Sequence, residues 1–249
     1  MLFRSRLRDQ LAQVGFANLE TAVRRIGTEL EPWTPGLTLP MKVAMSLMAA
    51  GWEKATSGVR AFRKELASLE EVMTLIATSW IDCRAATELG TMAEKPGMLA
   101  LNGSQSRTAV LYVQGACDLP VNDSWKVVQV DGAIGNGGIE ELKRLVRSAL
   151  SFRLGVELSE VDEEISKFTK REPLFIALPL GGLRPAALRE LRMEFPNLSF
   201  FLLTGDQHLP EEFAQQADLQ VLHPPLEPGS EQRFWKAHDD SLNYLKKMQ

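Results

Sequence analysis

Residues 125–150 read WKVVQVDGAIGNGGIEELKRLVRSAL and combine an apolar run, a glycine-rich turn and a second apolar pattern. The run from Trp125 to Val130 predicts a buried strand. After the turn, apolar residues recur at helical spacing and predict a helix with one buried stripe, formed by Ile139, Leu142, Val146 and Leu150. A strand that passes through glycines into a helix is the order used by phosphate-binding folds, because the helix N-terminus attracts anions.

The same alternation of strand and helix continues to the end of the chain and predicts a parallel sheet flanked by helices. The continuous apolar run Leu174–Leu178 is typical of the buried middle of such a sheet. Further strands are predicted at 199–206 and 219–222. Helices are predicted from a Ser159 cap to Phe168, from Pro185 to Phe195, at 211–216 and from about 230 onward.

The first 90 residues follow a different pattern, in which apolar residues recur at helical spacing throughout. Prolines at 32, 35 and 40 divide this region, since proline breaks helices. The segment GTMAEKPGMLALNGSQSR, residues 90–107, is rich in turn-forming residues. The predicted organisation is therefore an N-terminal helical bundle over residues 1–100, followed by an α/β domain over residues 107–249.

The glycine turn lacks the residues that handle phosphate and magnesium. A P-loop reads G-x-x-x-x-G-K-[ST], and Gly132 and Gly137 keep its glycine spacing. Gly138 and Ile139 stand where the lysine and the hydroxyl residue should be, and the run Leu174–Leu180 contains no acid that could hold magnesium. We therefore expect no cofactor, and at most a vestigial binding turn at Gly132, Gly135, Gly137 and Gly138. The same glycines equally fit a flexible strand-to-helix connection.

Over residues 107–249 this order of elements resembles the STAND and AAA+ group of P-loop NTPases. The matching pieces are VVQV with GAIGNGG, the Walker B-like LFIALP, FFLLTGD with Thr204 at the place of a sensor residue, and LQVLHPPLEP before a last helix. The missing lysine, hydroxyl and acids imply a degenerate, inactive domain. The resemblance is to inactive STAND modules of bacterial conflict and signalling systems, which are joined to small helical adaptor domains.

Other catalytic arrangements find less support in the sequence. His208, His223 and His238 are spaced 15 residues apart, so no two of them have the i, i+4 spacing of a helical metal site, and no metal is expected. No G-x-S-x-G turn occurs. Asp131, Asp206 and His223 each end or follow a predicted strand and could meet at the carboxyl edge of the sheet, which is the enzyme alternative.

Charge is nearly balanced, with 28 basic and 32 acidic residues and a net charge of -4. This balance gives no general electrostatic reason to bind nucleic acid. The helical half is locally basic, and an acidic partner or nucleic acid would dock there, through Arg4, Arg6, Arg8, Arg24, Arg25, Arg60, Arg63 and Lys64. An acidic cluster falls in the first turn of a predicted helix, where carboxylates offset the helix dipole: Glu160, Asp162, Glu163 and Glu164.

A cytoplasmic location is expected. Cys83 and Cys117 are too few for a disulfide framework. Charged residues interrupt the N-terminal sequence, so it lacks a signal-peptide core, and no run approaches the roughly 20 apolar residues that cross a bilayer.

These observations predict a non-catalytic adaptor or scaffold of a bacterial regulatory or defence system, which binds partner proteins such as an effector enzyme or a sensor. One alternative is a nucleotide or small-molecule binder, or an atypical NTPase, that uses the Gly132–Gly138 turn. A second alternative is nucleic-acid binding through the basic helical half. An exposed tryptophan would serve as an interface anchor, and the candidates are Trp33, Trp52, Trp80, Trp125 and Trp235.

Overall fold

The computed structural model describes residues 2–27, 37–92, 95–116, 126–130, 138–205 and 209–248, with the backbone alone at 2–5, 83, 91, 92 and 126. The chain divides into two compact units. Unit 1 comprises residues 1–81 and 232–249, and unit 2 comprises residues 82–231.

Unit 2 is built on a five-stranded sheet in which every described pairing is parallel. The strand order is β2-β3-β4-β1-β5. The strands are β1 (Met98–Leu101), β2 (Lys126–Gln129), β3 (Leu174–Pro179), β4 (Ser199–Leu203) and β5 (Leu219–Val221). The helices of this unit are α6 (Cys83–Met92), α7 (Ser106–Ala116), α8 (Gly138–Leu154), α9 (Val161–Thr169), α10 (Pro185–Glu194) and α11 (Glu211–Ala217).

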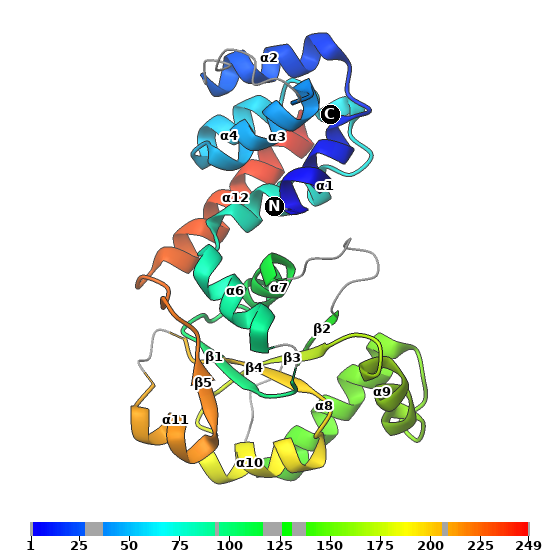
Figure 1. Ribbon diagram of the computed structural model, residues 1–249, viewed down its shortest axis with the longest axis vertical. Coiled ribbons are helices and arrows are strands. Elements are labelled where there is room, and N and C mark those ends of the chain that lie inside the picture. The colour runs from blue at the N-terminus through cyan, green and yellow to red at the C-terminus, as the bar shows by residue number, and fades with distance from the viewer. Residues whose placement is uncertain are drawn as a thin grey trace. The chain divides into compact units, whose positions relative to one another are not determined.

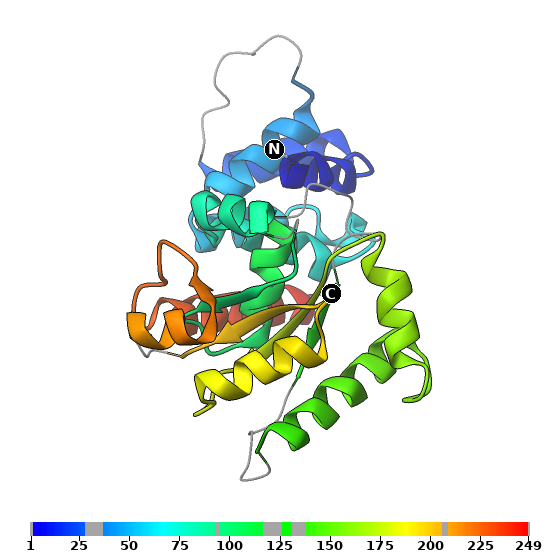
Figure 2. The same cartoon turned by 60° about the horizontal axis from the view of Figure 1, so that its bottom comes forward.

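Helices cover both faces of the sheet (Figure 1). α6 and α7 lie over one face, and α8, α10 and α11 lie over the other, which Figure 2 turns toward the viewer. All five residues of β4 are buried, because a strand in the middle of such a sheet contacts helices on both sides. The predicted fold class, an α/β protein with a parallel sheet flanked by helices, is confirmed at this level.

The interior strand β1 is the main difference from the sequence-based expectation, because residues 98–101 fall in the segment that was assigned to a turn-rich boundary. The structure places this strand between β4 and β5. Its run, MLAL, is only four residues long and lies between Pro96-Gly97 and Asn102-Gly103. A run this short does not stand out from its turn-forming neighbours. The helix that follows, α7, was also not predicted.

The other elements of unit 2 lie close to their predicted positions, with small shifts at their ends. α9 begins at Val161, and its N-cap residue is Glu160 instead of the predicted Ser159. β4 ends at Leu203, before the predicted limit at 206.

All described elements of unit 1 are helices. They are α1 (Leu2–Leu11), α2 (Phe16–Ile26), α3 (Leu39–Ala49), α4 (Trp52–Val59), α5 (Leu69–Ala77), two short 3-10 helices (Arg63–Glu65 and Thr78–Trp80), and α12 (Ser230–Lys247) from Gln232 onward. α12 belongs to this core because Leu245 is fully buried among the N-terminal helices. The observed division therefore differs from the predicted one: the boundary at 100–107 falls inside unit 2, and the last helix groups with the first ones.

Gly58 lies where α4 packs tightly against its neighbours in unit 1. A Cβ atom on Gly58 would lie 2.8 Å from Ile26 Cγ1 and 3.0 Å from Leu47 Cδ2. We expect Gly58→Val to lower the free energy of unfolding by about 1–3 kcal/mol, because added methyl groups overpack a filled core. Gly51→Ala is the control, since a Cβ there meets nothing within 4 Å. Urea unfolding of both variants checks this, and equal stability would contradict the close packing.

Candidate functional site

The carboxyl end of β1 is the topological switch point of the sheet. The chain leaves β1 for α7 on one face, whereas it leaves the neighbouring β4 for α11 on the opposite face (Figure 1). Ligands of open α/β sheets bind where strand connections diverge in this way. The loop Asn102–Gln105, between β1 and α7, is therefore the candidate functional site.

The carboxylate of Glu231 occupies this loop. The backbone N–H groups of Ser104 and Gln105 donate to it, at 2.7 Å and 3.1 Å. The hydroxyl of Ser104 donates to the same oxygen as its own N–H, at 2.7 Å, and the hydroxyl of Thr108 donates to the other oxygen. Glu231 is only 8% exposed. Two backbone amides and two hydroxyls thus surround a buried carboxylate at the N-terminal end of α7, where the helix dipole favours negative charge.

Asn102 and Gly103, the other residues of the loop, also contact the segment 226–231. A Cβ on Gly103 would lie 3.0 Å from Glu231 Oε1, so a side chain there would press against the carboxylate. The side-chain amide of Asn102 donates to the carbonyl of Leu226 at 2.6 Å and accepts from the Leu226 N–H at 2.7 Å. The Asn102 side chain therefore pairs with the backbone of Leu226 as another backbone segment would. These two hydrogen bonds fix the segment that leads to Glu231.

Neighbouring strand ends complete the surroundings of the loop. Thr204 N–H donates to the carbonyl of Leu101, and Gly205 N–H donates to the carbonyl of Gly103, both at 2.9 Å. The predicted sensor residue, Thr204, thus lies beside the end of β1. After β5, the N–H of His223 donates to Glu88 of α6 at 3.2 Å.

The glycine turn highlighted by the sequence belongs to another part of the sheet. It follows β2, which among the described strands lies at one edge of the sheet and pairs with β3. Gly132, Gly135 and Gly137 lie outside the described residues, whereas Gly138 begins α8 with a φ of +65°. A turn at an edge strand is not at the switch point.

Of the residues of the enzyme alternative, only His223 lies in the part of the chain that the structure describes. Asp131, Asp206 and His208 lie outside the described residues. His223 follows β5, and β5 and β2 are the opposite edges of the sheet. Four inter-strand spacings of about 4.8 Å place the ends of these two strands roughly 19 Å apart. The sequence suggested proximity because all these residues follow strands, but it could not give the strand order.

The third histidine, His238, lies in unit 1 and is buried in an aromatic cluster. Its ring centroid is 5.2 Å from that of Trp235 and 5.5 Å from that of Trp52. Trp80 stacks on Phe234 at 4.1 Å in the same cluster. Trp52, Trp80 and Trp235 are thus buried or partly buried in unit 1. Trp33 and Trp125 lie outside the described residues. The same holds for Cys117 and for the side chain of Cys83.

Several basic residues of the helical half are paired within unit 1. Arg6 lies 3.7 Å from Glu71, Arg60 donates to the hydroxyl of Tyr244, and Arg63 donates to the carbonyl of Met248. Arg8 pairs with Asp9, and Arg24, Arg25 and Lys64 are exposed. The side chain of Arg4 lies outside the described part.

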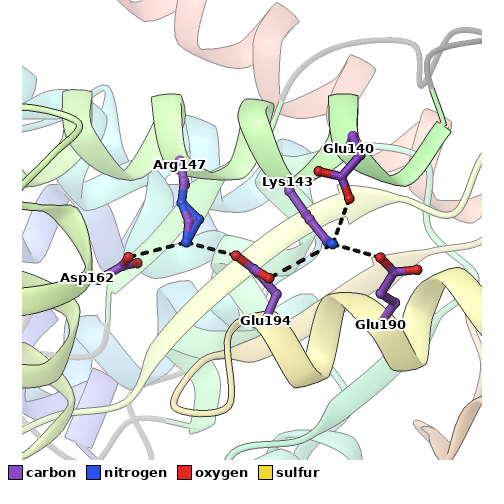
Figure 3. A network of polar contacts seen from close by, with 6 residues as sticks. All are labelled: Glu140, Lys143, Arg147, Asp162, Glu190 and Glu194. Carbon is purple, nitrogen blue, oxygen red and sulfur yellow. Dashed lines mark hydrogen bonds and ion pairs between the residues drawn. The ribbon is translucent and has the colours of Figure 1, made fainter.

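A network of ion pairs joins the outer helices of unit 2 (Figure 3). Lys143 of α8 lies 2.8 Å from Glu140 and 2.7 Å from Glu190 of α10. Arg147 bridges Glu194 of α10 and Asp162 of α9, at 2.9 Å and 3.2 Å. The hydrogen bonds that Lys143 donates to Glu140 first, and then to Glu190, raise the pKa of Lys143 well above its usual range. Both cations of this network, Lys143 and Arg147, have acidic partners, and the ion pairs join α8 to α9 and α10. Asp162, a member of the predicted acidic cluster, is one of these partners.

Tyr112, on α7, lies within the electrostatic influence of Glu231. Burial of the side chain, followed by the negative charges of Asp82 and Glu231, raises the pKa of Tyr112 to about 12 from 10.0. The neutral hydroxyl is thus favoured in the folded state. The stability associated with this shift is intact below pH 10 and is lost as the pH rises from 10 to about 12.

Alkaline unfolding tests this shift. At pH 11 the wild type should have lost about 1.4 kcal/mol of unfolding free energy through Tyr112, since one pKa unit corresponds to that amount. Phenylalanine at position 112 cannot ionise. Between pH 9 and pH 11 the unfolding free energy of Tyr112→Phe should therefore fall by about 1.4 kcal/mol less than that of the wild type. Urea unfolding at the two pH values measures it, and equal losses in both proteins would contradict it.

A pocket of about 330 Å³ opens at the amino ends of β3 and β4. Its lining includes Lys170, Arg171, Glu172 and Asn197. Ligand sites of parallel sheets lie at the carboxyl ends of the strands, so the loop after β1 remains the candidate site.

Among the described residues, no group of three or more histidine, cysteine or acidic side chains has the arrangement to hold a metal ion. Within the same residues, none of the helices combines the length and the apolar character needed to span a bilayer. In comparisons with known proteins, no protein family, no curated protein and no solved structure matched the chain.

Proposed function

We propose that this chain is a non-catalytic adaptor or scaffold, in which the α/β unit is a rigid platform and partner proteins supply the activity. The observation that carries this proposal is the position of Glu231. The Glu231 side chain fills the switch point, where a ligand of such a sheet would bind. Its carboxylate accepts all four of the hydrogen bonds that Ser104, Gln105 and Thr108 donate there.

Two further features support this proposal. The strand β3, LFIALP, ends without an acidic residue, so it offers no carboxylate for magnesium. Phe152 is 91% exposed and Met193 is 74% exposed on the helices of unit 2. We propose these two side chains as candidate contacts for a partner, since a few large side chains carry most of the binding energy of an interface. From the resemblance to inactive STAND modules we propose a bacterial regulatory or defence assembly as the setting of this adaptor, with an effector enzyme or a sensor as its partner.

Nucleotide titration is the first test. Calorimetry of the full-length protein with ATP, GTP and ADP plus magnesium should show no saturable heat, and no phosphate should be released. The alternative, a nucleotide binder that uses the Gly132–Gly138 turn, predicts binding that Gly137→Asp abolishes, because a carboxylate would repel phosphate. Saturable binding of any of these nucleotides would overturn the proposal of a ligand-free platform.

Binding to an identified partner is the second test. A partner that co-purifies with the tagged full-length chain should bind the purified protein directly in a two-component assay. Phe152→Asp should weaken this binding, because it replaces the exposed apolar side chain with a charge. Glu227→Ala, at an exposed residue of the same unit, is the control and should bind as the wild type does. If neither a partner nor a directly binding protein is obtained from cells that express the chain, the adaptor proposal fails.

A second candidate function is binding of nucleic acid or another polyanion by unit 1. Unit 1 contains 14 basic and 10 acidic residues, a net charge of +4, whereas unit 2 has a net charge of -8. Arg24 and Arg25 of α2 are both exposed. Binding of DNA or RNA oligonucleotides should weaken steeply with salt and be lost in the double variant Arg24→Glu, Arg25→Glu. Salt-independent binding, or none, would exclude this candidate.

A further inference from the structure

We propose that Glu231 is an internal ligand that autoinhibits the loop between β1 and α7, and that its carboxylate keeps external oxyanions out of this loop. This inference goes beyond the proposed adaptor function, because it concerns a contact within unit 2 and holds whether or not a partner protein binds.

The arrangement of donors is the first argument. Two consecutive backbone N–H groups, from Ser104 and Gln105, point at one carboxylate just before α7, an eleven-residue helix. Hydroxyls of Ser104 and Thr108 add two donors. Amides and hydroxyls at a helix N-terminus bind phosphate and carboxylate oxygens alike, because both ligands are anionic acceptors. The donor set is thus suited to any small oxyanion, and Glu231 is the one that the chain supplies.

The burial of the ligand is the second and independent argument. Glu231 is only 8% exposed, and an ionised carboxylate is rarely buried unless donors compensate for the lost water. Each of its two oxygens accepts two hydrogen bonds, which uses most of the acceptor capacity of the carboxylate. The four donors are therefore fully engaged by a group from a position 123 to 127 residues away in the sequence.

The fit of the surrounding chain is the third argument. The Asn102 amide holds residue 226 by two hydrogen bonds, and the Glu231 carboxylate lies close to Gly103, where a Cβ would be only 3.0 Å from Oε1. The segment 226–231 therefore contacts the loop at both of its ends, through Leu226 and through Glu231. A second anion in the same place would face both the filled volume and the repulsion of the carboxylate, so it binds only when Glu231 leaves.

Amide hydrogen exchange of the wild type tests the contact without any substitution. N–H groups at the start of a helix have no intrahelical acceptor and normally exchange fast. We expect the amides of Ser104 and Gln105 to be protected, because the Glu231 carboxylate accepts from both. Exchange of both amides at unprotected rates would overturn the proposal.

Phosphate titration tests the exclusion of external anions. Inorganic phosphate is added to the full-length protein, and the amide resonances of Ser104 and Gln105 are followed by NMR. Glu231→Ala should bind phosphate about tenfold or more tightly than the wild type, and the control Glu227→Ala should behave as the wild type does. Glu231→Gln keeps the size of the side chain but removes its charge, so its weaker hydrogen bonds let it leave the donors more readily and phosphate again binds more tightly; this variant replaces the alanine variant if that variant fails to fold. A folded variant at position 231 with the phosphate affinity of the wild type would overturn the proposal.

Discussion

Replacing Phe200 with alanine is expected to lower the free energy of unfolding by about 3–5 kcal/mol. Phe200 lies in β4, in the middle of the sheet, and is fully buried against the helices on the face that carries α8 and α10. Truncation loses the transfer free energy of the ring and leaves a cavity, since neighbours such as Phe195, whose ring centroid is 6.5 Å away, are held by their own packing. Urea unfolding should show a lower midpoint with an unchanged slope.

Phe152→Ala is the matched control, because it removes the same atoms from a residue of unit 2 that is 91% exposed. Its expected effect is within about 0.5 kcal/mol of the wild type. The comparison separates burial from the chemistry of the substitution. Similar losses for the two variants would contradict the packing of the sheet described above.

The sequence predicted the elements of unit 2 better than their arrangement. Runs such as Leu174–Leu178 predict strands because a central strand is buried on both faces, and their positions were confirmed. The strand order β2-β3-β4-β1-β5 depends on pairings between distant segments, such as Met98 with Phe200, and local patterns do not contain this information. The same reason explains why α12 was not assigned to the core of unit 1.

The candidate site was harder to predict because its residues are ordinary in their local context. Glu231 is an acidic residue in the first turn of a helix, where it would serve its own helix dipole. Its donors lie more than 120 residues earlier, in a loop after a strand too short to be recognised. The glycine-rich turn after β2 carried the stronger local signal, but it follows an edge strand. The available signal was the short run N-G-S-Q-S, residues 102–106, between an apolar run and a helix.

Removing the Glu231 side chain is expected to cost the folded protein about 2–4 kcal/mol. Glu231→Ala removes the acceptor of the N–H groups of Ser104 and Gln105 and of the buried hydroxyl of Thr108. Glu231→Gln should cost less, because its side-chain oxygen can still accept from some of these donors. Urea unfolding of both variants measures the loss, and the control Glu227→Ala should stay within about 0.5 kcal/mol of the wild type.

A double-mutant cycle distinguishes the hydrogen bonds from a general effect of truncation. Thr108→Val removes one donor while keeping the volume of the side chain, so it deletes one of the four contacts to the carboxylate. Combined with Glu231→Ala, it should cost less than the sum of the two single effects by about 1 kcal/mol, because the contact can be lost only once. Additive losses would mean that Thr108 and Glu231 stabilise the fold independently, and they would contradict the shared site. Because the alanine variant also exposes the phosphate-competent donors, added phosphate should restore part of its stability and leave the wild type unchanged.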